Sequence, residues 1–314
     1  MFRNLFISVL TIFVYTNVSS KCLSIPKSRI IDKAGLYCLE KNLEIESSIG
    51  ISINNSNVTL DFKGFSITSK SENKKFIYGI HIEKGKKNIK IFNGTINNAI
   101  VGIDIGPSES TSFNILIKDL KFKNIGAIGI RTYGSVEITN NVFENIGLQP
   151  IDDFAYSIGI SVGGKNVKIL KNKITRIKRQ NLNAIGEAVG ILIRDDCENC
   201  LIKDNLIDKK DGIEEANSYG IWNTGLEKVV IVKNKIIGFK YGILNNSGNY
   251  KIIFNEIICS NQKEDFGLVL YNNSQIQDIK IIQQSNDISS CTYPNFTCIT
   301  MDSNDCSNWL SESN

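Results

Sequence analysis

A short pattern of isoleucines around an asparagine returns along most of this chain, and it limits the possible folds more than any other feature. The clearest copy is Ile169–Ile174, which reads Ile-Leu-Lys-Asn-Lys-Ile. Related segments start at Ile91, Ile117, Ile138, Ile202, Ile231 and Ile252. In the first two of these, Gly94 and Leu120 stand where the others carry Asn. The chain is therefore built from a repeated unit.

A second element alternates with the first: a glycine followed by an aliphatic residue and a short run of strand-forming residues. It begins at Gly79, Gly102, Gly129, Gly159, Gly190, Gly220, Gly242 and Gly267. Successive glycines lie 22 to 31 residues apart. This period is typical of solenoids, and its irregularity argues against a helical repeat array. Each unit is therefore expected to hold two short strands and their turns.

The composition agrees with an all-β solenoid. Runs of β-branched residues are interrupted by Asn, Gly, Asp and Lys, and the 314 residues include only 4 prolines. No segment shows apolar residues at helical spacing over several turns, so we expect strands joined by tight turns. Because no single repeat can bury its own apolar face, the inward Ile and Val residues of stacked units must form one continuous core.

The opening of the chain and the repeat together resemble a known superfamily. Gly35–Leu39, Ile51–Ile53 and Asn57–Ile67 look like the first coils of the pectin-lyase-like proteins, which are right-handed parallel β-helices. The alternation of Gly-Ile strands with Ile-x-x-Asn-x-Ile strands is similar to the coil repeat of that superfamily over residues 35–285. The resemblance implies a single all-β, right-handed parallel β-helix of about eight or nine coils with capped ends. It implies no activity, because this fold carries many unrelated functions.

The repeat divides the chain into four segments. Residues 1–20 have Arg3 near the start, an apolar core from Leu5 to Val14 and the small residue Ser20, which is the layout of a cleaved secretory signal peptide. An uncleaved membrane anchor is the alternative. We expect an N-terminal cap over 21–45, the parallel β-helix over 46–285 and a cysteine-bearing C-terminal cap over 286–314. The protein is then secreted or held at a cell or virion surface, with no stable membrane insertion after cleavage.

All 8 cysteines follow the predicted signal peptide, and an even count in an exported chain favours disulfides. Cys22 and Cys38 are expected to close the start of the solenoid. Cys197 and Cys200 are expected to close a small loop, because a zinc site or redox pair would need partners that the neighbouring sequence lacks. The remaining four are expected to close the end of the solenoid, with a pairing that the sequence leaves open: Cys259, Cys291, Cys298 and Cys306.

The asparagine column has a structural explanation. An Asn in a sharp turn can adopt the left-handed conformation and hydrogen-bond the Asn of the neighbouring coil. We therefore predict a ladder of hydrogen bonds along Asn141, Asn172, Asn205, Asn234 and Asn255.

Side chains that alternate along the Gly-Ile strands must form columns on the outer face, because successive residues of a strand point to opposite sides. One predicted column is His81, Asp104, Arg131, Ser161, Leu192, Trp222, Leu244 and Val269. A second is Glu83, Gly106, Tyr133, Gly163, Arg194, Thr224, Asn246 and Tyr271. By contrast, the aromatic residues before the strand glycines are expected to point into the core: Tyr78, Tyr219, Tyr241 and Phe266.

Three long connections are predicted on consecutive coils, over 144–158, 175–189 and 208–219. Long loops on a rigid scaffold commonly form binding sites, so we expect them to border a groove over the outer columns. Aromatic faces, Arg forks and paired carboxylates suit a sugar chain, and carboxylates can also hold Ca²⁺. The candidate catalytic residues are Arg131, Arg194, Asp152, Asp153 and Glu187; the candidate substrate-binding residues are Trp222, Tyr133, His81 and Asp104; the candidate calcium ligands are Asp195 and Asp196.

The predicted function is a secreted carbohydrate-active protein that binds a polysaccharide in this lateral groove, with lyase or hydrolase activity as its enzymatic form. The catalytic signatures of the superfamily's enzymes are absent, since His81 is flanked by Ile residues and Arg176-Ile177-Lys178 falls in a predicted loop. A lyase needs only a base and a cation for the substrate carboxylate, and Arg can supply both. The alternative is a non-catalytic structural or adhesin-like glycoprotein, which the sequons at Asn54, Asn57, Asn93, Asn245, Asn272 and Asn295 would fit.

The charge distribution bears on the partner class. The formal net charge is +4, and Lys and Glu are scattered among the turns without forming a basic stripe. This argues against nucleic acid as a partner. The sequence leaves the oligomeric state open.

Overall fold

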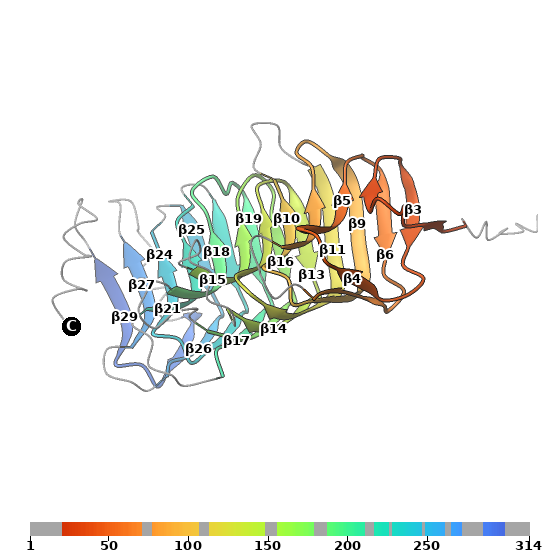
Figure 1. Ribbon diagram of the computed structural model, residues 1–314. Helices are drawn as coiled ribbons and strands as arrows, with labels where there is room; N and C mark the ends of the chain where they lie inside the picture. Colours follow the sequence, from red (N-terminus) through yellow and green to blue (C-terminus); the bar gives the residue numbers. More distant parts are fainter. Residues whose placement is uncertain are drawn as a thin grey trace, which may run out of the picture.

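The computed structural model describes residues 21–70, 77–106, 113–147, 156–178, 187–210, 217–225, 228–246, 249–260, 265–271 and 285–298. These residues form a parallel β-helix of stacked coils, which confirms the predicted all-β fold. The coils stack into a rod, with β3 near one end and β29 at the other (Figure 1). The predicted signal peptide over 1–20 lies outside the described residues.

The smaller sheet contains the Gly-aliphatic strands, and we call it the Gly sheet. Its 11 strands in the described residues follow one another in sequence order, and their pairings are parallel. They are β2 (Ile30–Ile31), β5 (Ile49–Ile53), β8 (Tyr78–Ile82), β10 (Val101–Ile105), β12 (Ile128–Thr132), β15 (Tyr156–Val162), β18 (Glu187–Ile193), β21 (Ser218–Asn223), β24 (Tyr241–Asn245), β27 (Phe266–Tyr271) and β29 (Tyr293–Cys298).

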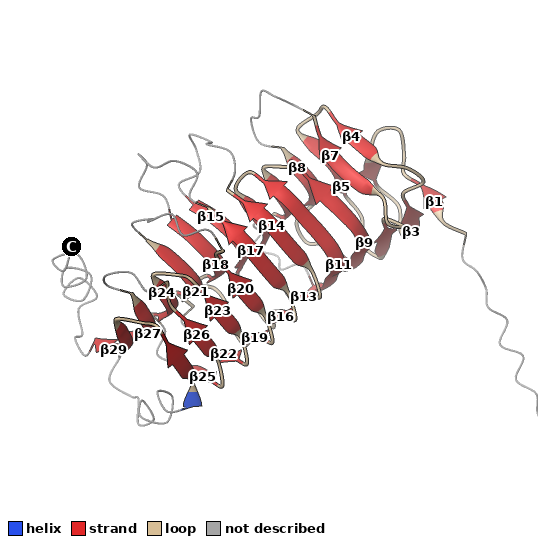
Figure 2. Cartoon of the chain, turned by 90° about the horizontal axis from the view of Figure 1, so that it is seen from below, coloured by secondary structure: helices blue, strands red, loops and turns tan. Residues whose placement is uncertain are grey.

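The larger sheet contains the strands on both sides of the Asn turn, and we call it the Asn sheet (Figure 2). Most coils give it two short strands, whereas β9 (Lys87–Asn97) and β11 (Phe113–Ile125) each run through as one long strand. The other strands are β1 (Leu23–Ser24), β3 (Gly35–Cys38), β4 (Leu43–Ile45), β6 (Val58–Asp61), β7 (Ser66–Ser69), β13 (Val136–Thr139), β14 (Val142–Ile146), β16 (Lys168–Leu170), β17 (Lys173–Ile177), β19 (Cys200–Lys203), β20 (Leu206–Asp208), β22 (Val229–Val232), β23 (Lys235–Ile237), β25 (Tyr250–Ile253), β26 (Glu256–Ile258) and β28 (Asp287–Ser289).

The strand glycines mark the line where the two sheets approach most closely. A Cβ atom added to Gly129 would lie 2.6 Å from Cδ1 of Phe143 in the facing Asn sheet. A larger residue would therefore push the sheets apart, which a close-packed core does not tolerate. Columns of buried isoleucines fill the core, together with Phe122 and Phe143, whose stacked rings have centroids 4.5 Å apart.

The predicted Asn ladder is present. Nδ2 of Asn141 donates to Oδ1 of Asn172 at 3.0 Å, and the same oxygen accepts the backbone N–H of Asn141 at 2.9 Å. Equivalent side-chain bonds join Asn172, Asn205, Asn234, Asn255 and Asn286. The left-handed conformation, however, falls one residue earlier than predicted: Lys171 has a φ of 53°, whereas Asn172 does not have a positive φ. The turn residue before each Asn bends the chain and leaves the Asn free to bond along the rod.

The disulfides hold the ends of the rod and one turn. Cys22–Cys38, Cys197–Cys200 and Cys259–Cys291 are formed, which confirms the first two predicted pairs and pairs two of the last four cysteines. Cys298 ends β29, but its side chain is not described, and Cys306 lies outside the described residues.

The two predicted caps are described only in part. Over residues 21–45, β1 pairs with β3, and β3 and β4 pair with β6 and β7, so this segment continues the Asn sheet. Over 286–314, β28 and β29 extend both sheets, and the residues from 299 onward lie outside the described part. In the described segments, no helix has the length and apolar character needed to cross a membrane.

Candidate functional site

The outer face of the Gly sheet carries the first predicted column in register. Coils in such a sheet lie about 4.8 Å apart, so side chains of adjacent coils can touch. Strand pairing aligns residues that are 22 to 31 positions apart in the sequence, in the order His81, Asp104, Arg131, Ser161, Leu192, Trp222, Leu244 and Val269.

His81, Asp104 and Arg131 form one hydrogen-bonded cluster on β8, β10 and β12. Nδ1 of His81 lies 3.0 Å from Oδ2 of Asp104, and Nε of Arg131 donates to Oδ1 of Asp104 at 2.7 Å. The Asp104 side chain is 4% exposed, whereas those of His81 and Arg131 are each 21% exposed. Asp104 is therefore a buried anchor that orients its two neighbours toward the surface.

The cluster changes the pKa values of its members. The hydrogen bond to Asp104 raises the pKa of His81 above its ordinary value, against the opposing effect of burial. Burial acts to raise the pKa of Asp104, but the hydrogen bonds from His81 and Arg131 outweigh it and leave that pKa lowered. Asp104 thus stays ionised, so it has no proton to donate as a general acid and it accepts hydrogen bonds from Arg131 and from protonated His81.

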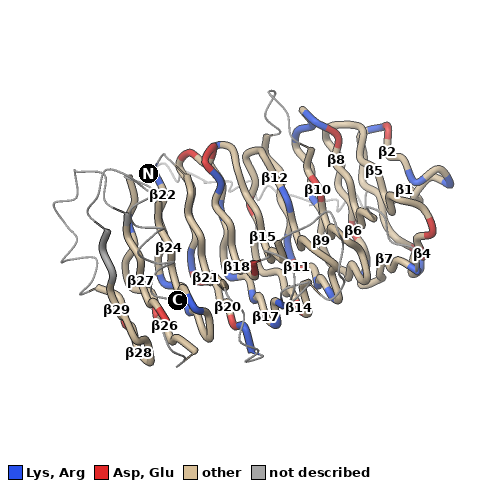
Figure 3. The backbone as a smooth tube through the Cα atoms, turned by 60° about the vertical axis from the view of Figure 1, so that its left-hand side comes forward, with Lys and Arg blue, Asp and Glu red and all other residues tan. Residues whose placement is uncertain are grey.

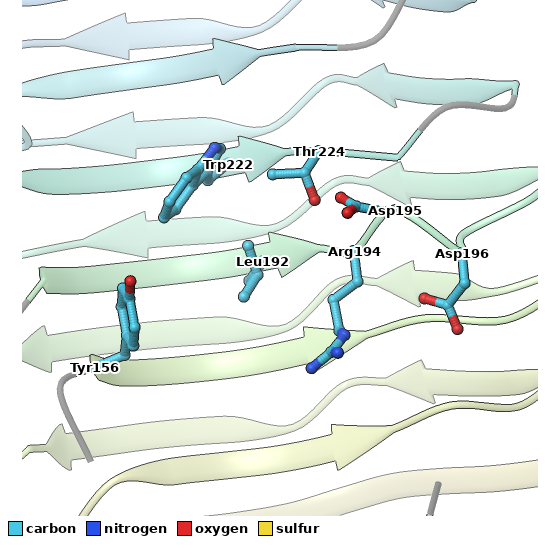
Figure 4. A pocket seen from close by; sticks show the side chains of 7 residues that line it. All are labelled: Tyr156, Leu192, Arg194, Asp195, Asp196, Trp222 and Thr224. Atoms are coloured by element: carbon cyan, nitrogen blue, oxygen red, sulfur yellow. The ribbon is translucent and has the colours of Figure 1, made fainter. Parts of the chain in front are cut away.

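A pocket of about 440 Å³ opens on the same face, further along the rod. Its lining residues divide into two groups (Figure 4). Leu192 and Trp222 lie side by side on adjacent strands, and Tyr156 stands next to them with 41% of its surface exposed. The other side is polar and is formed by Arg194, Asp195, Asp196 and Thr224. The pocket therefore offers an apolar surface beside charged donors and acceptors.

Arg194 crosses a coil to reach Tyr133. The guanidinium carbon of Arg194 lies 4.5 Å from the centroid of the Tyr133 ring. The residue between them in the second column is Gly163, which has no side chain to block this path. A Cβ atom added to Gly163 would collide with the carboxylate of Asp196. Arg131 lies two residues before Tyr133 and interacts with it electrostatically, so both predicted catalytic arginines lie in the neighbourhood of this residue.

An aromatic column beside the pocket corrects one prediction. Tyr219, Tyr241 and Phe266 are buried, as predicted, but they lie on the outer side of the Gly sheet. The Tyr219 ring stacks on Trp222 with centroids 4.7 Å apart, and Gly220 between them faces the core. Further stacked pairs continue from Tyr219 to Tyr241, Phe266 and Tyr293. Gly220 and the buried Ile221 both face the core, so simple alternation assigns the preceding residue to the wrong side.

Glu187, a predicted catalytic residue, and Arg176, from a predicted loop, do not line the pocket. Glu187 begins strand β18 instead of lying in a loop, and its Oε1 accepts a hydrogen bond from the Tyr219 hydroxyl at 3.3 Å. Arg176 lies in strand β17 of the Asn sheet, where it pairs with Glu144 of the preceding coil at 3.0 Å. The predicted loop 175–189 is therefore shorter than expected. Asp152 and Asp153 lie outside the described residues.

The calcium prediction concerns a turn closed by a disulfide. Asp195 and Asp196 precede Cys197, which is bonded to Cys200. Figure 4 shows the Asp195 carboxylate near Thr224 and the Asp196 carboxylate apart from it. Across the described segments, no group of three or more His, Cys, Asp or Glu side chains is arranged to hold a metal ion. A Ca²⁺ ion usually has six to eight oxygen ligands, so two carboxylates alone do not define a site. Calcium binding stays a prediction.

Comparison with known proteins identifies no family. No family model matches the chain. A stretch of 104 residues is 29% identical to Protein CARMIL of Dictyostelium discoideum, which covers 33% of this chain and 10% of that protein. The chain thus spans about a tenth of the length of the curated relative that it matches.

Two solved structures align with most of this chain at low similarity. The catalytic unit of a thermostable GH87 alpha-1,3-glucanase from Streptomyces thermodiastaticus is 10% identical, with a TM-score of 0.35 over 84% of this chain and 53% of the glucanase. A GH87 alpha-1,3-glucanase catalytic domain in complex with tetrasaccharides is 11% identical, with a TM-score of 0.25 over 79% of this chain and 68% of that chain. At these values, neither likeness supports a functional argument.

Proposed function

We propose that this protein is a carbohydrate-active β-helix protein that binds a polysaccharide along the outer face of the Gly sheet. One observation carries the proposal: a single pocket combines Trp222 and Tyr156 on one side with Arg194 on the other. Sugar rings present apolar C–H faces, which pack on aromatic rings, and hydroxyl groups, which need polar partners. The pocket supplies both kinds of surface within reach of one or two sugar units.

The charges favour an acidic sugar. No Asp or Glu of the described residues forms an ion pair with Arg194, whose guanidinium lies over the Tyr133 ring. A guanidinium in this position can still direct N–H groups to a ligand, and its fork of donors suits a bidentate bond to a carboxylate. We therefore place a uronic-acid unit against Arg194 and the apolar face of a neighbouring unit against Trp222.

If the protein is an enzyme, the reaction we propose is cleavage of the bound polysaccharide by a lyase mechanism. In a lyase reaction, a base removes the proton beside the uronate carboxylate, a carbon–carbon double bond forms, and the glycosidic oxygen leaves and takes up a proton. Arg194 and Arg131 are the candidate residues in the described part, with Arg194 neutralising the carboxylate. Burial acts to lower the pKa of Arg131, but the ion pair with Asp104 outweighs it and leaves that pKa raised. Arg131 therefore keeps its proton and adds positive charge beside the substrate, and another group must act as the base.

An extracellular location is part of the proposal. Three disulfides are formed in the described residues, and disulfides persist in oxidising environments. The predicted signal peptide over 1–20 would deliver the chain there.

Tryptophan fluorescence tests the binding proposal directly. The chain has 2 tryptophans, so a Trp309→Phe variant leaves Trp222 as the only emitter. We expect a saturable shift in its emission on titration with polygalacturonate, and a smaller one with a neutral glucan. Titration calorimetry of Trp222→Ala in the otherwise unmodified chain should show binding weakened by about tenfold, which corresponds to ~1.4 kcal/mol.

The matched control is Phe254→Ala, because Phe254 is 61% exposed on the turn of the Asn sheet, away from the pocket. Its affinity should equal that of the unmodified protein. Lyase activity would appear as ultraviolet absorbance of the unsaturated product and should disappear in Arg194→Ala. An absence of binding to every polyuronate and glucan tested would reject the proposal and favour the alternative of a rigid, non-catalytic surface glycoprotein.

A further inference from the structure

A second cavity, of about 280 Å³, lies at the N-terminal end of the rod. It forms where the chain leaves β1 toward β2 and where it turns from β3 into β4. The pocket described above lies over β15, β18 and β21, several coils away along the Gly sheet. The two cavities therefore share no lining residue.

The lining of this end cavity is rich in positive charge. Lys27, Arg29 and Lys41 all contribute to it, and Glu40 is the acidic residue among the lining residues. The Ser24 hydroxyl donates to Oε1 of Glu40 at 2.7 Å, which occupies part of that carboxylate. None of the three cations forms an ion pair with a carboxylate of the described residues. Figure 3 shows the Lys and Arg segments beside β1 and β2.

The cavity is also rigid. The Cys22–Cys38 disulfide joins its two sides, and β1 pairs with β3 through Leu23–Tyr37 and Ser24–Cys38. Arg29 has a left-handed φ of 59°, and its backbone N–H donates to the carbonyl of Pro26 at 2.8 Å. The same left-handed conformation occurs at other turns of this chain, such as Lys171, so at Arg29 it marks a tight turn that shapes the backbone beside the cavity.

Apolar residues complete the walls. Ile25, Pro26, Leu39 and Leu43 line the cavity together with the charged side chains, and Leu39 is buried. Arg29 is half-buried beside these walls, where fewer water molecules screen its charge and its attraction to an anion is stronger, whereas Lys27 and Lys41 are exposed. Like charges brought together without a counter-ion repel each other, so an anion placed among the three cations would relieve that repulsion.

We propose that this end cavity is a binding site for an anionic group, namely a sulfate, phosphate or carboxylate group carried by a larger molecule. Lys27, Arg29 and Lys41 contact the anion, and the apolar walls contact the part of the molecule that carries it. The proposal does not depend on polysaccharide binding in the groove.

Isothermal titration calorimetry at constant ionic strength tests this site with three probes: inorganic sulfate, inorganic phosphate and monomeric galacturonate. The full chain should show saturable binding to at least one of them. The combined variant Lys27→Gln, Arg29→Gln and Lys41→Gln should bind that probe at least about tenfold more weakly, because each charge-assisted bond is lost. The probe that binds best identifies the anionic group.

The control variant removes the same charge from a different surface. Lys171→Gln, Lys233→Gln and Lys251→Gln change three exposed lysines of the Asn sheet that form no ion pair within the described residues. This variant should retain the affinity of the unmodified protein. Absence of saturable binding to all three probes, or an equal loss in both triple variants, would overturn the proposal. Neither outcome would affect the fluorescence test of the groove, so the two proposals fail separately.

Discussion

The guanidinium of Arg194 lies over the ring of Tyr133, with 4.5 Å between its carbon atom and the ring centroid. The two residues are separated by 61 positions in the sequence, and the coil between them contributes only Gly163 at that place in the column. A missing side chain thus creates the space in which an arginine from one coil meets an aromatic ring from another. The candidate site depends on this gap as much as on the charged residue.

Gly163→Ala should damage the site with little effect on the fold. The new Cβ would collide with the Asp196 carboxylate and disturb Arg194, so we expect polyuronate affinity to fall by about tenfold. The free energy of unfolding should fall by about 1 kcal/mol, since the position lies on the outer face. Titration calorimetry and urea unfolding measure the two effects.

Gly106→Ala is the matched control for this change. A Cβ there would lie 3.8 Å from Cε1 of His81, which is an ordinary contact, so binding and stability should both be retained. Equal losses in the two variants would contradict the role assigned to the gap at Gly163.

Asn205→Ala should destabilise the rod strongly. Oδ1 of Asn205 accepts from the backbone and the side chain of Asn172, and its Nδ2 donates to Oδ1 of Asn234. Removal leaves several buried polar groups without partners, and we expect a loss of about 3 kcal/mol in the free energy of unfolding. Urea denaturation of Asn97→Ala, which loses one half-buried bond from Asn124, should show a loss of about 1 kcal/mol or less. Similar losses in both variants would show that the ladder adds little.

The pair of His81 and Asp104 predicts how the stability of the protein depends on pH. His81 has a raised pKa, so its contribution to stability is complete below the unfolded value near 6.5 and is lost as the pH rises through the folded pKa. Asp104 has a lowered pKa, so its contribution is present above the unfolded value near 3.8 and is lost as the pH falls through the folded pKa. The pair should therefore stabilise the protein most between about pH 4 and 6.5.

Proton NMR can follow the titration of His81 directly, because the chain has one histidine and its imidazole signals need no further assignment. Its titration midpoint should lie above 6.5 and move down toward that value in Asp104→Asn. Thermal unfolding of His81→Gln should show a weaker decline above neutral pH than the unmodified protein. A midpoint at or below 6.5 in the unmodified protein would contradict the bonded geometry.

Removing the Cys197–Cys200 disulfide should affect both stability and groove binding, whereas removing the Cys22–Cys38 disulfide should affect stability alone. Cys197 and Cys200 close the turn that carries Asp195 and Asp196, with a sequence separation of 3. Changing both cysteines to Ser should cost about 2 kcal/mol and weaken polyuronate binding several-fold, because the turn loses its constraint. The measurements are urea unfolding and titration calorimetry.

The corresponding change at Cys22 and Cys38, with a sequence separation of 16, should cost about 3 kcal/mol and leave groove binding unchanged. If groove affinity were lost in the Cys22 and Cys38 variant but retained in the Cys197 and Cys200 variant, polysaccharide binding would lie at the N-terminal end of the rod, which would contradict the proposal.

The sequence by itself determined the solenoid and its register. Isoleucines and asparagines recur at positions that can only be buried together if the coils stack, so the Asn172 ladder and the neighbouring positions of His81, Asp104 and Arg131 follow from counting along the repeat. Strand alternation and parallel pairing are local rules, and they act the same way on every coil.

Only the tertiary structure decided which side chains meet beyond those neighbours. The contact of Arg194 with Tyr133, the outward aromatic column at Tyr219 and the cations gathered around Arg29 depend on side-chain reach, strand bends and the path of the end turns. A repeat pattern places residues on a face but does not specify how far a long side chain extends or where a strand bends. Those features arise from packing between coils, where gaps such as Gly163 decide which groups can touch.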